Sequence, residues 1–290
     1  MTPFSIHPDT TVGPVYLNIS DLARSKRFYR DVIGFKTFEH RDDTLTLTAD
    51  GTSPLLILKG QPGAHPKPRH TTGLYHFAIL VPSRADLARS LRRLIDVHYP
   101  LQGASDHLVS EALYLADPDG NGIEIYRDRS RDTWTQQNGQ VQMTIDPLDT
   151  EELLAELKES DHTWNGLSPG TVIGHMHLHV ADLRQAEAFY HGVLGFDVML
   201  RYGPSALFLS AGGYHHHIGL NTWAGIGAPP PPPDTVGLRQ FVVALPNHEE
   251  LERVAQRVRQ AEIATEQTVD GFLIRDPSQN GALLAQMPKK

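Results

Sequence analysis

Apolar residues recur along this chain in four short, strand-like runs, and each run opens with a glycine. A segment with helical spacing of apolar residues follows each run, and three short alternating runs follow that segment. This order predicts four copies of one βαβββ unit and therefore an α+β fold. The four units open at the following glycines: Gly13, Gly73, Gly174 and Gly237.

The predicted helices are of two types that alternate along the chain. Units one and three align without a gap, and their helices begin at an aspartate in the N-cap position, Asp21 or Asp182. The helix of unit one is predicted over 21–32. Units two and four share a different helix, predicted over 84–97 and 247–261. Such an order is expected when a two-unit half has been duplicated.

The predicted domains contain two units each, and 290 residues are enough for two domains. The first domain spans 10–130 and the second spans 171–288. Between them lies a linker, 131–170, which is polar and contains one predicted helix around 151–157.

Composition and charge narrow the classes of function. The net charge of −8 arises without long runs of one sign, which argues against nucleic acid and anionic membranes as partners. No apolar stretch approaches the roughly 18–20 residues of a transmembrane helix, and the first residues lack a secretory signal pattern, so we expect a cytoplasmic protein. Cysteine is absent. Any metal site must therefore use histidine and carboxylate ligands.

Residues able to bind a metal occur at equivalent positions in the middle two units. The third residue after the glycine is His76 in unit two and His177 in unit three. The last predicted strand of unit two carries Glu124 inside an apolar run. An ionised glutamate in such a run needs a charged partner or a metal ion. We therefore predict a metal site formed by these three residues.

The first strand of unit three offers three histidines on one face: His175, His177 and His179. Residues two apart in a strand are separated by about 6.6 Å, too far for neighbours to bind one ion easily. The spacing from the glycine selects His177. We expect His175 and His179 to line the pocket or to support the ligands.

These residues and their spacing resemble the vicinal oxygen chelate superfamily, in which paired βαβββ modules form cupped mixed sheets around a metal. Within it, the chain is most similar to the extradiol ring-cleaving dioxygenases of the catechol 2,3-dioxygenase type. The resemblance implies an Fe(II) site at His76, Glu124 and His177, where Mn(II) is also accepted. It implies that the substrates are O2 and catechol or a substituted catechol.

The resemblance also implies the catalytic side chains. Tyr114, on the strand before the one that carries Glu124, and His107, in the preceding loop, are expected to hydrogen-bond the substrate oxygens. The acid–base group is expected in the run of three histidines that begins at His215. We predict either His216 or His217, because the sequence defines the register of that strand only to within one residue.

One feature departs from the family pattern, because no two adjacent units complete the metal site. Units one and four have other residues at the ligand positions: Tyr16, Gln240 and Leu283. Pairing unit two with unit three would complete the site, either within one chain or between two chains. A homodimer or higher oligomer is therefore one predicted arrangement.

Two other functions stay open. One is a different metal-dependent activity of the superfamily, such as a glyoxalase-type isomerase or a thiol transferase. Glyoxalases of this fold usually have a fourth protein ligand, where this chain offers Gly219 or Leu220. The other is a non-catalytic binding protein for small molecules, which has no need for three residues at ligand positions.

Overall fold

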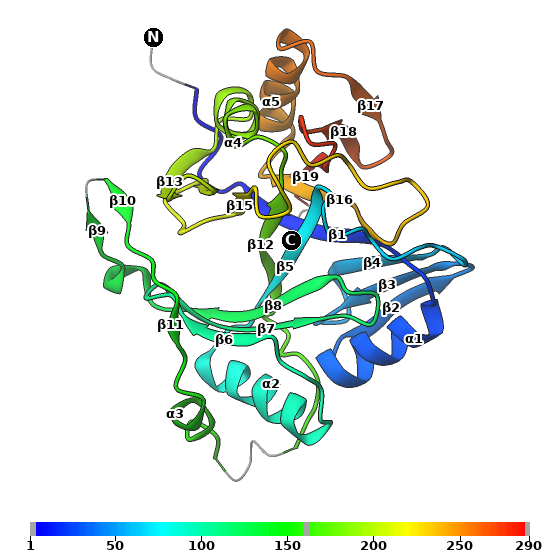
Figure 1. The fold of residues 1–290 in the computed structure, drawn as a ribbon, viewed down its shortest axis with the longest axis vertical. Helices are drawn as coiled ribbons and strands as arrows, with labels where there is room; N and C mark the ends of the chain where they lie inside the picture. Colours follow the sequence, from blue (N-terminus) through cyan, green and yellow to red (C-terminus); the bar gives the residue numbers. More distant parts are fainter. Residues whose placement is uncertain (1–3, 138, 159–162, 288–290) are drawn as a thin grey trace.

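Two curved sheets form the framework of the protein in a computed structural model that describes residues 4–137, 139–158 and 163–287 (Figure 1). The eight-stranded sheet has the order β17-β18-β19-β16-β1-β4-β3-β2, and the nine-stranded sheet has the order β11-β6-β7-β8-β5-β12-β15-β14-β13. The strands of the first sheet are β1 (Thr11–Ile19), β2 (Lys36–Arg41), β3 (Thr44–Thr48), β4 (Pro54–Gly60), β16 (Gly237–Leu245), β17 (Thr265–Gln267), β18 (Gly271–Arg275) and β19 (Gly281–Gln286). Those of the second are β5 (Gly73–Leu80), β6 (Gly103–Asp106), β7 (Ser110–Ala116), β8 (Gly122–Asp128), β11 (Asp146–Pro147), β12 (Val172–His179), β13 (Asp197–Tyr202), β14 (Ala206–Ser210) and β15 (Ile218–Asn221).

Each sheet combines one unit from either half of the chain. Strand β5 of unit two pairs antiparallel with β12 of unit three, and β1 of unit one pairs antiparallel with β16 of unit four. The predicted α+β fold of four βαβββ units is confirmed, and the pairing of units two and three occurs within one chain. The sheets do not follow the predicted division into 10–130 and 171–288, because the first strands of the units pair across that division.

The helices of units one and three contain a wider turn that their sequence spacing does not predict. Helix α1 (Leu22–Arg27) begins where the Asp21 side chain accepts a hydrogen bond from the Arg24 N–H at 2.9 Å. It continues as a π-helix over Phe28–Ile33, and unit three repeats this arrangement with α4 (Leu183–Glu187) and a π-helix over Ala188–Val193. The wider turn buries adjacent aromatic side chains at its start in unit one.

The remaining predicted helices are present. Helices α2 (Arg84–Asp96) and α5 (His248–Gln260) are capped by Ser83 and Asn247 and bury their apolar faces. In Figure 1, α2 lies next to strands β6, β7 and β8 of the second sheet. The linker helix α3 (Thr150–Leu154) is shorter than predicted. In the described part of the chain, every helix is too short or too polar to span a lipid bilayer.

Buried tyrosine–aspartate hydrogen bonds join the two sheets. The hydroxyl of Tyr29, in unit one, donates to Asp117 Oδ2 of unit two at 2.8 Å. The equivalent Tyr190 of unit three donates to Asp276 of unit four at 3.1 Å. Burial raises the pKa of Asp117, and hydrogen bonds from Asn121 and Tyr29 oppose that rise. Each bond therefore solvates a carboxyl group that has no access to bulk water.

Removing the Tyr29 hydroxyl is expected to loosen the contact between the sheets. Tyr29→Phe should lower the free energy of unfolding by about 1–3 kcal/mol, because it leaves a buried carboxyl group short of one donor. Tyr190→Phe is the matched change at the second junction and should act in the same direction. Urea unfolding followed by circular dichroism measures both, and unchanged midpoints would show that neither hydroxyl stabilises the junction.

Candidate metal centre and active site

Three neighbouring strands of the second sheet place a glutamate and two histidines around one point. Strand β5 lies between β8, which is parallel to it, and β12, which is antiparallel. Ala78 pairs with Glu124 on one side and with His175 on the other, so these residues form one row across the sheet. The small side chain of Ala78 leaves room above it for its two larger neighbours. His76 lies two residues before Ala78 and therefore faces the same side.

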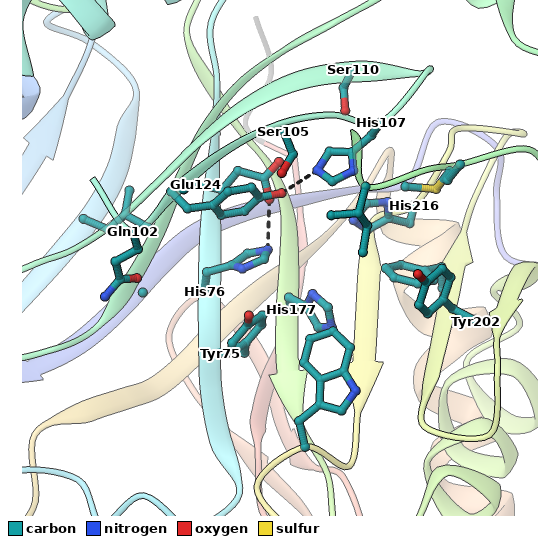
Figure 2. A pocket seen from close by; sticks show the side chains of 18 of the residues that line it. Tyr75, His76, Gln102, Ser105, His107, Ser110, Glu124, His177, Tyr202 and His216 are labelled. Atoms are coloured by element: carbon teal, nitrogen blue, oxygen red, sulfur yellow. Dashed lines mark hydrogen bonds and ion pairs between the residues drawn. The ribbon is translucent and has the colours of Figure 1, made fainter. Parts of the chain in front are cut away.

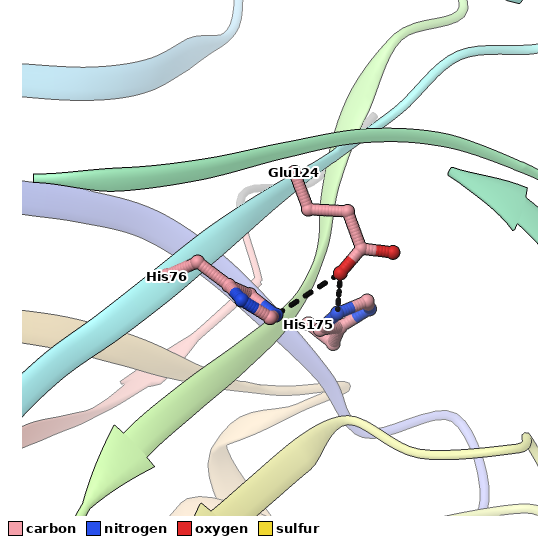
Figure 3. Close-up of side chains that lie close together, drawn as sticks. All are labelled: His76, Glu124 and His175. Carbon is pink, nitrogen blue, oxygen red and sulfur yellow. Dashed lines mark hydrogen bonds and ion pairs between the residues drawn. The ribbon is translucent and has the colours of Figure 1, made fainter. Parts of the chain in front are cut away.

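The side chains of His76, Glu124 and His175 converge (Figure 3). Glu124 Oε2 lies 3.0 Å from His76 Nε2 and 3.0 Å from His175 Nε2. The three side chains are buried, with residue exposures of 6%, 3% and 1% for His76, Glu124 and His175. Among the described residues, none forms a hydrogen bond of good geometry with His76 Nε2 or His175 Nδ1. A cation bound between the three side chains would give His76 Nε2 a partner.

The cluster contains His175, whereas the sequence predicted His177 as the ligand. His177 lies directly opposite His76, one row away from Glu124, and Asn221 Nδ2 donates to its Nε2 at 3.0 Å. The spacing from the glycine selects His76 and His177, which lie opposite each other. Glu124 instead lies in the neighbouring row, with Ala78 and His175. His179 donates from Nδ1 to the Asn221 side-chain oxygen at 2.7 Å and lies outside the cluster.

The glycines are also not equivalent in structure. Gly73 begins β5 with a left-handed φ of 114°, whereas Gly174 lies inside β12. A Cβ atom on Gly174 would lie 1.8 Å from the Tyr126 hydroxyl, so close packing requires glycine there. The shared residue type therefore has two different causes, and the count of residues from the glycine selects His177 rather than the clustered His175.

The electrostatics of the cluster suit a cation. Burial alone would raise the pKa of Glu124, but His175 and His76 hold it well below its usual value. Burial lowers the pKa of His175 to about 4, although Glu124 opposes that shift. The cluster therefore holds an ionised carboxylate and a neutral imidazole, the protonation states that metal binding requires. Two histidines and one carboxylate are the donor set of many non-haem iron sites, so these residues fit a divalent transition-metal ion.

A cavity of about 340 Å³ opens beside the cluster, and His76, Glu124, His177 and His216 form part of its wall (Figure 2). Opposite walls come from β6, β7, the segment after β10 (Gln140–Val141), and strands β13 and β14. The volume suits a small organic molecule. The apolar and aromatic part of the lining consists of Tyr75, Tyr114, Leu115, Ile123, Met143, Ile145, Leu200, Tyr202, Phe208 and Trp223.

The predicted residues Tyr114 and His107 lie together in this cavity. Tyr114 is the β7 partner of Glu124, and its hydroxyl lies 2.7 Å from His107 Nε2. His107 Nδ1 lies 2.6 Å from the Thr144 carbonyl, which can only accept, so Nδ1 carries the proton and Nε2 accepts from Tyr114. Burial and the charge of Glu124 raise the pKa of Tyr114 well above its usual value. The phenol therefore stays protonated and can donate.

The run of three histidines lies just before β15, outside regular strand structure. His216 lines the cavity, and its ring centre lies 4.1 Å from that of His175. His217 instead accepts a hydrogen bond at Nδ1 from the Ala211 N–H at 3.2 Å and is not part of the cavity wall. Of the two predicted alternatives, the structure places only His216 beside the cluster.

Two side chains that were not predicted lie behind His216. His215 is fully buried and lies within hydrogen-bond distance of both His216 and Asp128. Asp128 is the last residue of β8, far from the histidines in sequence. The only sequence signal for His215 is its place in the run, because strand alternation does not apply outside a strand.

Known dioxygenases are similar to this chain in sequence. A Catechol-2,3-dioxygenase from Bacillus subtilis (strain 168) is 52% identical over 276 residues, which cover 94% of this chain and 96% of that relative. Biphenyl-2,3-diol 1,2-dioxygenase 3 from Rhodococcus globerulus is 31% identical over 114 residues, which cover 39% of this chain and 60% of that relative.

Solved structures share the fold at low sequence identity. A putative dioxygenase from Bacillus subtilis has a TM-score of 0.66 at 14% identity, covering 99% of this chain and 87% of that one. Glyoxalase I from Zea mays has a TM-score of 0.57 at 13% identity, covering 96% and 92%.

The family model matches both halves of the chain, over residues 11–125 and 172–280. This match confirms the resemblance predicted from the sequence. The chain therefore belongs to the Glyoxalase/Bleomycin resistance protein/Dioxygenase superfamily.

Proposed function

We propose that this protein is an extradiol dioxygenase, which opens the ring of catechol or a substituted catechol beside the diol and adds both atoms of O2 to the product. The observation that carries the proposal is the buried His76–Glu124–His175 cluster at the wall of a cavity for a small molecule. The 52% identity to a catechol-2,3-dioxygenase over nearly the whole chain supports the same reaction. A cytoplasmic location stays a prediction from the sequence.

The metal in this proposal is Fe(II), and Mn(II) is the alternative that the same donor set accepts. His76, Glu124 and His175 would hold it. When bound, the ion supplies the Lewis-acid and redox chemistry by which a diol and O2 react. Units two and three pair within one chain, so a second copy is not needed to complete the ligand set.

The cavity side chains have separate roles toward the diol. The Tyr114 phenol has one proton, which it donates to His107. When a diol binds, the phenol can turn that proton to a substrate oxygen and so favour the ionised diol. His216 is neutral, because burial lowers its pKa well below the usual value. A neutral imidazole can accept a proton from the substrate and return it later. The aromatic wall, which includes Phe208 and Trp223, excludes water and suits a flat ring.

A glyoxalase-type isomerase is disfavoured by the strand beside His177. Gly219 of β15 is the direct partner of His177, and a glycine offers no fourth ligand. A Cβ atom there would lie 2.9 Å from the His177 ring, so a larger residue would displace that ring. The structure therefore gives no support for the fourth ligand that the isomerase interpretation needs.

Ring cleavage is tested with protein reconstituted anaerobically with Fe(II) and then mixed with catechol and O2. We expect a yellow ring-opened product and uptake of one O2 per catechol, because both oxygen atoms enter the product. An oxygen electrode and absorption spectroscopy measure the two quantities. Binding of catechol without oxygen uptake would contradict the proposal and favour a binding protein.

The choice of His175 over His177 is tested by metal content. His175→Gln and Glu124→Gln should each reduce the bound iron at least tenfold, because each removes a ligand. His177→Gln is the matched control on the same strand and should retain iron. Elemental analysis of the folded variants measures this, with circular dichroism as the check on folding. The ligand assignment fails if His177→Gln loses the iron and His175→Gln keeps it.

A further inference from the structure

Three side chains within hydrogen-bond distance of one another, beginning with His216, lead away from the cavity. His216 Nδ1 lies 2.8 Å from His215 Nδ1, and His215 Nε2 lies 2.9 Å from Asp128 Oδ1. His215 has no exposed surface, so water cannot replace either partner. The side chain of Asp128, 24% exposed, forms the outer end.

Aromatic side chains shield His215, the middle residue of the three, from water. The ring of Trp134 lies 5.3 Å from that of His215, and Tyr214 stacks at 4.1 Å. The indole N–H of Trp134 donates to the Arg129 carbonyl at 3.0 Å, which fixes the ring in place. The Arg131 guanidinium lies over both aromatic rings. His215 therefore has a fixed set of hydrogen-bond partners.

The proton positions follow from counting donors. The Asp128 carboxylate can only accept, so His215 carries its proton on Nε2. When His215 is neutral it has only this one N–H, so its Nδ1 is an acceptor. The short contact between the two Nδ1 atoms then requires the proton of His216 to lie on Nδ1. Nε2 of His216 is left with a free lone pair, and among the described residues none forms a hydrogen bond with it.

We propose that Asp128 and His215 are positioning residues that hold His216 in the Nδ1–H tautomer, with its unprotonated Nε2 available to a ligand in the cavity. The proposal deepens the proposed function, since a base needs this lone pair to take a proton from the diol. In the opposite tautomer, Nε2 would be a donor and could not accept that proton. The arrangement follows the general rule that a catalytic base is oriented by a third group.

The test is the ring ¹⁵N spectrum of His216 in the metal-free protein, recorded near neutral pH with ¹⁵N-histidine and assigned with His216→Gln. We expect a protonated Nδ1 and an unprotonated Nε2. Asp128→Ala should shift His216 toward the Nε2–H form, because His215 then has no acceptor that fixes its own proton. Tyr214→Phe is the matched control: it removes the second donor to Asp128 Oδ1, at 3.2 Å, and should leave the tautomer unchanged.

The proposal is overturned if His216 of the unaltered protein carries its proton on Nε2, or if Asp128→Ala leaves the tautomer unchanged. The unaltered protein alone decides the first point, so a misfolded variant does not remove the test. In the iron-loaded enzyme, Asp128→Ala should lower kcat for catechol by about 10²-fold with little change in KM, since the base rather than binding is affected. The spectrum is independent of turnover, so an inactive protein with the expected tautomer would count against the proposed function only.

Discussion

The antiparallel pairing of β5 with β12 is the constraint on which the site depends. It brings together residues that lie about a hundred positions apart in the sequence and sets which side chains share a row. With β8 on the other side of β5, the register aligns Glu124, Ala78 and His175. A shift of one residue in this pairing would turn the histidines of β12 to the other face of the sheet.

The first sheet shows what the same architecture becomes without a ligand set. Val242 pairs with Leu283 there as Ala78 pairs with Glu124 in the second sheet. A valine fills the space that the alanine leaves open, and a leucine replaces the carboxylate. These residues form a small apolar cluster instead of a polar one. Units one and four, which form the first sheet, therefore contribute packing. Tyrosine–aspartate hydrogen bonds hold them against units two and three, which carry the site.

The sequence predicted the units, most helices and two of the three cluster residues, because each depends on local spacing or on a single repeat. Glu124 and His76 follow from their positions within unit two, and Tyr114 follows from the family resemblance. His175 could not be chosen from the sequence, because the choice depends on the register between two strands. The contact of Asp128 with His215 depends on tertiary structure in the same way, since 87 positions separate them.

The central claim is that one metal ion lies between β5, β8 and β12. The most direct measurement is a crystal structure of the iron-loaded protein with anomalous diffraction at the iron edge. The account predicts a single strong peak within bonding distance of His76, Glu124 and His175. A peak bound by His177 instead of His175, or located in the first sheet near Leu283, would contradict it.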